Sequence, residues 1–311
     1  MASSNADTTG VILLAFGGAD SMDGVEPFVR NVFKGRGDVG PELIEDAKRR
    51  YRLIGGASPL VKITKAQAGA LGELLNKKGD RYAVSVGMLN SPPFIKDAVK
   101  EMKDRGVSEA AAIVMSAHST PASTGGYRSA MEEALKETGG VPRVDFMGGW
   151  HTHPLYIEAV VETVNEALLC EKFSAKQDTL VIFSAHSLPV HLIANDPYVD
   201  RIGETIAEVA KKVDIEWKLA FQSRGRRGEW LGPGVEEVMK EAKDTGRKGV
   251  LIVPVGFTSD HIETLYDIDI FFKEAARVLG LGFSRAPSLN TREKFMEMLA
   301  DVILRRRHER P

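Results

Sequence analysis

Short apolar runs alternate with amphipathic segments along the 311-residue chain, and this alternation limits the folds that it can adopt. The apolar runs have the length and content of buried parallel strands, and they lie at 11–16, 82–88, 110–117, 144–147, 180–185, 217–223, 249–257 and, more weakly, 281–286. The segments with helical spacing lie at about 41–53, 63–78, 92–105, 126–138, 154–171, 200–213, 233–245, 260–279 and 292–307. Such alternation predicts an α/β, doubly wound fold in which right-handed crossovers join parallel strands.

The number of strand–helix units exceeds what a single flavodoxin-like sheet requires, and it predicts two similar lobes, each with a parallel sheet. The composition changes near GGWHTHP (148–154), so we place the boundary there. The N-terminal lobe is then 1–150 and the C-terminal lobe 151–311. The last helix, 292–307, is a candidate to pack back on the N-terminal lobe.

Composition excludes several classes of protein. The net charge is only -2, which argues against bulk affinity for nucleic acid or an anionic membrane. The single cysteine, Cys170, excludes an internal disulfide framework, a cysteine-ligated zinc site and an iron–sulfur cluster within one chain. Residues 1–10 lack the apolar core of a signal peptide, and no apolar run approaches the roughly 20 residues that span a bilayer. We therefore expect a cytoplasmic protein with no transmembrane segment.

The tetrapeptide Ser-Ala-His-Ser occurs twice, at 116–119 and 184–187. It follows the third predicted strand of the first lobe and the first of the second, so it is not a clean internal duplication. Both copies fall at carboxyl ends of predicted strands, where parallel sheets bind ligands. A histidine there is more often structural than catalytic, and the chain has no G-x-S-x-G elbow of a serine hydrolase. The residues alone leave both roles open for His118 and for His186.

A second candidate stretch is VPVGFTSDHIETLYDIDIFFKE, 253–274. Asp260, Glu263, Asp267 and Glu274 recur at a spacing that places them along one face of a helix. One interpretation is a capping box, with Asp260 as N-cap and Glu263 as its reciprocal partner. The other is a hydrated acidic stripe that conducts cations, because capping leaves Asp267 unexplained. Spacing does not choose between them.

Five stretches together resemble ferrochelatases, the enzymes that insert ferrous iron into a porphyrin. They are AFGG (15–18), YRLIGGASPL (51–60), SAHSLP (184–189), WLGP (230–233) and VPVGFTSDHIETLYDID (253–269). No single motif is decisive, but the set occurs in the family's order and spans nearly the whole chain. The resemblance implies two Rossmann-like lobes with a cleft between them, in agreement with the alternation.

The resemblance treats the two histidines differently. It implies that His186 is the metal ligand and proton acceptor, and that Glu263 faces it across the site. Asp267, a turn farther along the helix, would pass metal inward or protons outward. His118 matches no catalytic position of the family, so we expect it to be structural.

The resemblance also implies the porphyrin-binding residues, which are Phe16, Arg50, Tyr51, Ser58 and Tyr127. Two of these have plainer interpretations: Arg50 ends the basic run KRR and suits a solvent-facing helix surface, and Ser58 suits a helix cap. Relatives in the coproporphyrin branch commonly carry tyrosine where this chain has Phe16, which cannot bind iron. Tyr127 matches a second tyrosine position of the family and could supply an oxygen instead.

The resemblance favours coproporphyrin III as substrate, giving iron coproporphyrin, over protoporphyrin IX, giving protohaem. It implies that Fe²⁺ is a substrate, with no permanently bound cofactor and no iron–sulfur cluster. We expect a monomer with at most transient contacts to neighbouring haem-pathway enzymes. Two alternatives stay open: a non-catalytic tetrapyrrole or metal carrier, and a cobalt chelatase of corrin biosynthesis.

Overall fold

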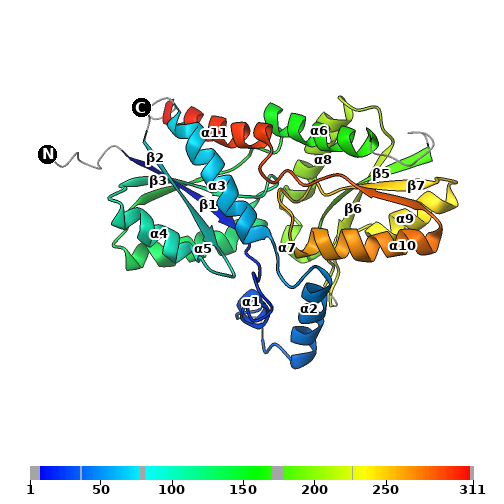
Figure 1. Ribbon diagram of the computed structural model, residues 1–311, viewed down its shortest axis with the longest axis horizontal. Helices are drawn as coiled ribbons and strands as arrows, with labels where there is room; N and C mark the ends of the chain where they lie inside the picture. Colours follow the sequence, from blue (N-terminus) through cyan, green and yellow to red (C-terminus); the bar gives the residue numbers. More distant parts are fainter. Residues whose placement is uncertain (1–7, 36, 78–80, 170–177, 226, 309–311) are drawn as a thin grey trace. The chain divides into compact units, whose positions relative to one another are not determined.

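The computed structural model describes residues 8–35, 37–77, 81–169, 178–225 and 227–308, and Cys170 lies outside these ranges. The chain forms two compact units. Unit 1 contains the chain up to Gly149 and again from Asn290, and unit 2 is Trp150–Leu289. Each unit is built on a four-stranded parallel sheet with helices on both faces (Figure 1). The predicted α/β fold is confirmed.

All eight predicted strands are present. They are β1 (Thr9–Ala15), β2 (Tyr82–Met88), β3 (Glu109–Val114), β4 (Arg143–Met147), β5 (Thr179–His186), β6 (Trp217–Gln222), β7 (Gly249–Val253) and β8 (Gly282–Arg285). The sheet of unit 1 has the order β2-β1-β3-β4, and that of unit 2 has the order β6-β5-β7-β8. In both units the first strand of the unit is therefore central and is covered on both faces, which explains its uninterrupted apolar sequence.

The helices of unit 1 are α1 (Val25–Val32), α2 (Pro41–Leu53), α3 (Leu60–Asn76), α4 (Ile95–Asp104), α5 (Pro121–Glu137) and α11 (Glu293–His308). One face of the sheet packs against α4 and α5 through a core that includes Ile12, Val99 and Met131. On the other face α3 contacts β1 and β2, and α11 packs against α3 (Figure 1).

The helices of unit 2 are α6 (Pro154–Leu169), α7 (Val190–Ile193), α8 (Tyr198–Ala210), α9 (Val235–Asp244), the π-helix η3 (Glu263–Phe272) and α10 (Lys273–Leu279). The core between the sheet and α9, η3 and α10 includes Ile182, Met239 and Ile268. Helices α6 and α8 contact each other, and α6 also contacts β7.

The two units repeat one topology, and the strand register identifies their matching positions. Leu14 pairs with Val114, the last residue of β3, and Phe183 pairs with Val253, the last residue of β7. Counting on from these pairs makes AFGG the counterpart of Ser-Ala-His-Ser at 184–187. The copy at 116–119 follows a different strand, so the repeated letters do not mark a duplication.

Candidate active site

Three neighbouring strands of unit 2 bring polar side chains to the carboxyl edge of the sheet. His186 is the last residue of β5, Ser223 follows β6, and Glu263 begins η3 after β7. Because β5 lies between β6 and β7, these three residues meet at one place. Gly256 permits the approach, since a Cβ there would lie 2.7 Å from the Cα of Ala185, while its N–H donates to the carbonyl of Ser184 at 3.0 Å.

His186 and Glu263 form a direct pair, with 2.9 Å between Nδ1 and Oε2. The side chains are 37% and 26% exposed. An ionised carboxylate only accepts hydrogen bonds, so Nδ1 of His186 carries the proton and, in the neutral ring, Nε2 carries the lone pair. Among the described residues, Nε2 has no hydrogen-bond partner. The hydroxyl of Tyr198 donates to the carbonyl of His186 at 3.0 Å and fixes the backbone that presents the ring.

The charges of this pair set both protonation states. Burial disfavours the imidazolium, but the charge and hydrogen bond of Glu263, together with the charge of Asp267, outweigh it and raise the pKa of His186 above 6.5. Burial also disfavours the carboxylate of Glu263, and there the charge and hydrogen bond of His186 prevail and lower its pKa to about 2. Glu263 is therefore ionised near neutral pH, and His186 is a stronger base than an isolated imidazole.

The prediction that Glu263 faces His186 across the site is wrong. Strands β5 and β7 are hydrogen-bonded neighbours, and the chain leaves β7 directly for η3. Both side chains therefore extend from the same edge of one sheet, where they contact each other.

Ser223 joins Asp267 to the pair. Its hydroxyl lies 3.2 Å from Oε2 of Glu263 and 2.7 Å from Oδ2 of Asp267. The π-helical turn of η3 is wider than an α-helical turn, and such turns occur often at functional sites. The sequence prediction that Glu263 and Asp267 lie near each other is thus confirmed, whereas the part played by Ser223 was not foreseen.

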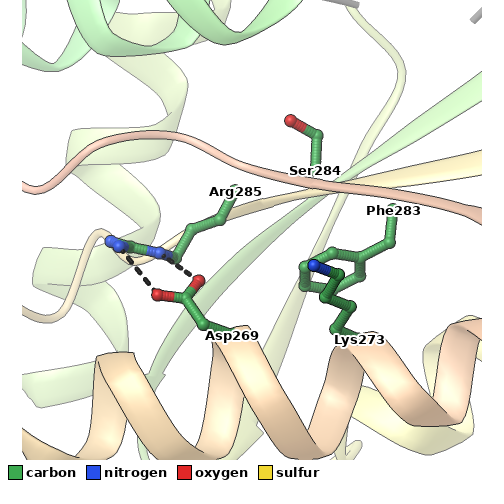
Figure 2. Close-up of a pocket in the computed structure, with 5 residues that line it drawn as sticks. All are labelled: Asp269, Lys273, Phe283, Ser284 and Arg285. Atoms are coloured by element: carbon green, nitrogen blue, oxygen red, sulfur yellow. Dashed lines mark hydrogen bonds and ion pairs between the residues drawn. The ribbon is translucent and has the colours of Figure 1, made fainter. Parts of the chain in front are cut away.

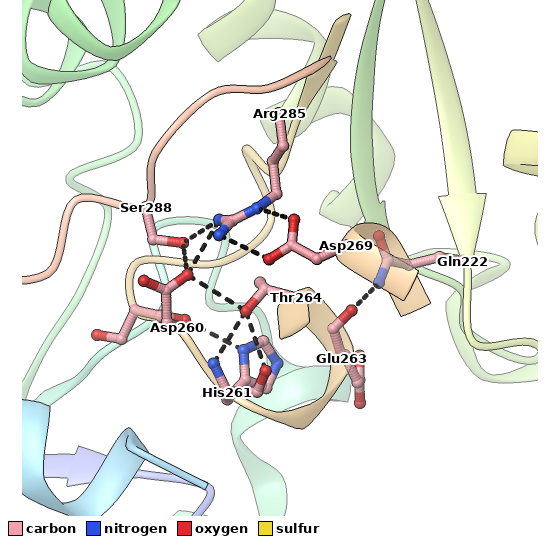
Figure 3. A network of polar contacts seen from close by, with 9 residues as sticks. Gln222, Asp260, His261, Glu263, Thr264, Asp269, Arg285 and Ser288 are labelled. Carbon is pink, nitrogen blue, oxygen red and sulfur yellow. Dashed lines mark hydrogen bonds and ion pairs between the residues drawn. The ribbon is translucent and has the colours of Figure 1, made fainter. Parts of the chain in front are cut away.

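The other two acids of the predicted stripe, Asp260 and Glu274, point elsewhere. The prediction of one continuous row of four carboxylates is therefore wrong. Asp260 accepts hydrogen bonds from Arg285 at 3.0 Å and from Ser288 at 2.8 Å (Figure 3). Glu274 pairs with Arg277 at the surface. The capping-box interpretation also fails for Glu263, because its carboxylate contacts His186 and Ser223 rather than the backbone of Asp260.

Arg285 anchors η3 from the strand beside it. Its guanidinium binds Asp269 in a bidentate manner at 2.7 and 3.0 Å while it also binds Asp260. The same ion pair borders a small open pocket of about 270 Å³, also lined by Lys273, Phe283 and Ser284 (Figure 2). Neither feature includes His186 or Glu263.

His261 is a neighbour that the sequence reasoning missed. Its Nδ1 donates to the carbonyl of Ser259 at 3.1 Å, which places the lone pair of the neutral ring on Nε2 (Figure 3). Burial lowers the pKa of His261 and outweighs the opposing charges of Glu263 and Asp260. The available signal was its position in SDHIE, two residues before Glu263.

Three of the predicted porphyrin-binding residues surround the loop that follows β1 in unit 1. Phe16 is 45% exposed, whereas Tyr51 and Ser58 are buried. The hydroxyl of Tyr51 accepts from the N–H of Ala19 at 3.1 Å, and the N–H of Ser58 donates to the carbonyl of Ala19 at 2.7 Å. The hydroxyl of Ser58 also accepts from the N–H of Leu60, the first residue of α3, at 3.4 Å, although the N-cap position itself is Pro59. Tyr51 and Ser58 therefore shape the loop that carries Phe16.

The remaining predicted residues of unit 1 lie apart from that loop or face solvent. Arg50 pairs with Asp46 at 2.9 Å on α2, and its side chain is 42% exposed. Tyr127 belongs to the core against α4, where burial raises the pKa of its phenol. This position gives no support to the prediction that Tyr127 supplies an oxygen ligand. His118 is 1% exposed, in a turn after β3, as a structural histidine would be.

Two features are absent from the described residues. No helix there is both long and apolar enough to cross a membrane. No three or more His, Cys, Asp or Glu side chains there are grouped so that they could hold a metal ion. The metal-binding roles predicted for His186, Glu263 and Asp267 stay predictions.

Comparison with known proteins decides the family. The family model described as Ferrochelatase matches residues 8–307. The chain belongs to the ferrochelatase family. It is thus an enzyme of haem biosynthesis that inserts a metal into a porphyrin, and the resemblance noted in the sequence is confirmed.

Relatives within the ferrochelatase family align along nearly their full length. The ferrochelatase of Geotalea daltonii is 38% identical over 316 residues, which cover 96% of this chain and 98% of the relative. That of Deinococcus radiodurans is 36% identical, covering 98% of both. The coproporphyrin III ferrochelatase of Halalkalibacterium halodurans is 36% identical, covering 97% and 98%.

Solved chelatase structures share the fold at low sequence identity. The sirohydrochlorin chelatase SirB from Bacillus subtilis, in complex with cobalt, has a TM-score of 0.56 at 9% identity and covers 96% of this chain and 94% of its own. CbiX, described as the terminal enzyme for biosynthesis of sirohaem in denitrifying bacteria, has a TM-score of 0.53 at 11% identity, covering 95% and 98%. The fold is therefore that of chelatases.

Proposed function

We propose that this chain inserts Fe²⁺ into coproporphyrin III and that Nε2 of His186 is the base of the reaction. One observation carries the second part: Glu263 holds Nδ1 of the half-exposed ring, so the lone pair of the neutral ring lies on Nε2. A base with a pKa raised above 6.5 accepts protons readily near neutral pH.

The chemistry requires such a base because insertion of the metal replaces two pyrrole N–H bonds with nitrogen–metal bonds. Nε2 accepts one pyrrole proton at a time and passes it to solvent. The ionised Glu263 stabilises the imidazolium formed at each transfer, the same interaction that raises the pKa of His186. Imidazole nitrogen and carboxylate oxygen also suit the entering Fe²⁺, which is a substrate here. We propose no permanently bound cofactor.

The choice of porphyrin rests on charge and on relatives. Coproporphyrin III carries four propionates and protoporphyrin IX carries two. A relative 36% identical to this chain is named a coproporphyrin III ferrochelatase, although others are named simply ferrochelatase. Arg50 is partly exposed and is the proposed propionate partner, which exchanges Asp46 for the substrate.

The test is an anaerobic spectroscopic assay with Fe²⁺ and three tetrapyrroles: coproporphyrin III, protoporphyrin IX and sirohydrochlorin. We expect the highest kcat/KM with coproporphyrin III and no product from sirohydrochlorin. Arg50→Ala should raise KM for coproporphyrin III by about tenfold, and by less for protoporphyrin IX. Arg49→Ala is the matched control, because Arg49 pairs with the same Asp46 from the same helix. Faster insertion into protoporphyrin IX would refute the substrate assignment, and insertion into sirohydrochlorin alone would indicate the corrin-type alternative.

A further inference from the structure

Ser223 has a backbone conformation that a residue with a side chain seldom adopts. Its φ is +59°, and among the described residues only Asn290, at +47°, is another non-glycine residue with positive φ. The left-handed region crowds the Cβ atom, so glycine would relieve the strain. Such strain persists where the surroundings impose it, often at functional sites.

The strained backbone brings the hydroxyl of Ser223 between two acids. Oγ lies 3.2 Å from Oε2 of Glu263 and 2.7 Å from Oδ2 of Asp267. The neighbouring Gln222 donates from Nε2 to the main-chain carbonyl of Glu263 at 3.2 Å, so the end of β6 holds the start of η3 by two residues in succession (Figure 3). Side chain and main chain of Glu263 are thus fixed from the same strand end.

We propose that Ser223 is a positioning residue, whose hydroxyl holds Glu263 against His186 and keeps Asp267 beside the pair. The inference rests on the proposed function, because it assigns Ser223 a part in metal insertion. The single hydroxyl proton of Ser223 is shared between the two carboxylates, with the shorter contact to Oδ2 of Asp267 at 2.7 Å and the longer one to Oε2 of Glu263 at 3.2 Å. This shared bond limits the rotation of both acids. Without it, the carboxylate of Glu263 is held by His186 alone, and Asp267 loses its 2.7 Å contact to the site.

A purely structural role would favour a different residue at position 223. If the position served only to turn the chain after β6, glycine would serve better than serine, because glycine adopts positive φ without strain. The hydroxyl of Ser223 therefore affects activity, and its strained backbone affects stability. Substitutions can distinguish the two effects.

The experiment compares Ser223→Gly, Ser223→Ala and Ser223→Asn with the wild-type chain in anaerobic Fe²⁺ insertion and in thermal unfolding. Ser223→Gly should raise Tm by a few degrees, about what relief of the strain provides, and yet lower kcat roughly ten- to a hundredfold. Ser223→Ala should lower kcat as much, with KM for the porphyrin unchanged. Ser223→Asn should recover part of kcat, since asparagine tolerates positive φ and its amide donates two hydrogen bonds.

Asn290→Gly is the control, because it removes the only other such strain in the described residues without touching the site. It should raise Tm in the same way and leave kcat at the wild-type value. If Ser223→Gly matches or exceeds the wild-type kcat, the positioning role is refuted while the proposed function stands. If the wild-type chain inserts no metal into any porphyrin, the proposed function itself fails.

Discussion

His186 and Glu263 form one chemical unit, because each sets the charge of the other. The pKa of Glu263 falls to about 2 and that of His186 rises, so the pair is ionic in weakly acidic solution. Asp267 belongs to the same group through the hydroxyl of Ser223, whereas Glu263 contacts the ring of His186 directly. This difference in contact predicts a difference in kinetic effect.

Glu263→Gln should lower kcat for iron insertion by at least tenfold more than Asp267→Asn. The amide removes the negative charge that stabilises the imidazolium of His186, whereas Asp267 acts from one hydroxyl farther away. Steady-state kinetics on both variants measure the ratio, and thermal unfolding serves as the control for folding. Equal, small losses of kcat with equal drops in Tm would mean that both acids are structural.

The pH dependence follows from the raised pKa of His186. The base must be neutral to accept a proton, so kcat/KM should rise with pH through an apparent pKa above 6.5. Glu263→Gln removes the charge that raises this pKa. The acidic limb of the kcat/KM profile of this variant should therefore move to lower pH. A limb in the same place for both proteins would contradict the assignment of His186 as the titrating base.

The pair of His186 and Glu263 should also make the free energy of unfolding depend on pH. His186, with a raised pKa, contributes below its unfolded value of 6.5, and the contribution is lost as pH rises through the folded pKa. Glu263, with a lowered pKa, contributes above its unfolded value of 4.5 and loses this as pH falls toward about 2. Urea unfolding of wild type and Glu263→Gln should therefore differ most between pH 4.5 and 6.5. A larger difference in alkaline solution would be inconsistent with this pairing.

At the scale of the elements, the segment after β7 must pass close to β5 for the site to assemble. Gly256→Ala would place a Cβ 2.7 Å from the backbone of Ala185, so the segment must shift away and carry Glu263 with it. We expect a loss of about 1–3 kcal/mol in unfolding free energy, together with lower kcat. Gly203→Ala, on α8 with nothing near the new methyl group, should instead stabilise by up to about 1 kcal/mol. Similar effects of the two substitutions would refute this role of Gly256.

Loss of the ion pairs between Arg285 and the acids at η3 should lower the unfolding free energy. Arg285→Gln leaves Asp260 and Asp269 without their shared cation, and the side chains of Arg285 and Asp260 are only 15% and 20% exposed. We expect a loss of about 3 kcal/mol in urea unfolding. Arg277→Gln breaks an exposed pair with Glu274 and should leave the unfolding free energy nearly unchanged. An equally small effect at Arg285 would show that η3 does not depend on this anchor.

The sequence predicted the strands well because central parallel strands are apolar on both faces, as in β1 and β5. It missed α7, whose four residues are too few to show a helical period, and it also missed α1, although its eight residues are amphipathic. It gave the helix at 260–279 but not its π-helical part, because the spacing of apolar residues hardly differs between the two helix types over ten residues. It missed Ser223 because no local signal marks a serine with positive φ. The resemblance supplied the choice between His118 and His186, which spacing had left open.

For the chain as a whole, the family establishes metal insertion, and the open question is which residues perform it. A carrier would bind porphyrin and metal without needing the pair of His186 and Glu263. The two copies of Ser-Ala-His-Ser provide an internal comparison, since His118 is buried after β3 and His186 ends β5 with Nε2 available.

The most direct measurement is single-turnover Fe²⁺ insertion into coproporphyrin III, followed anaerobically by absorbance, for wild type, His186→Ala and His118→Ala. Wild type and His118→Ala should both form the metalloporphyrin at similar rates per folded molecule, with His118→Ala lower in Tm because its side chain is buried. His186→Ala should bind the porphyrin within about tenfold of wild type and yet form no product on this timescale. Product formation by His186→Ala at the wild-type rate would contradict the account.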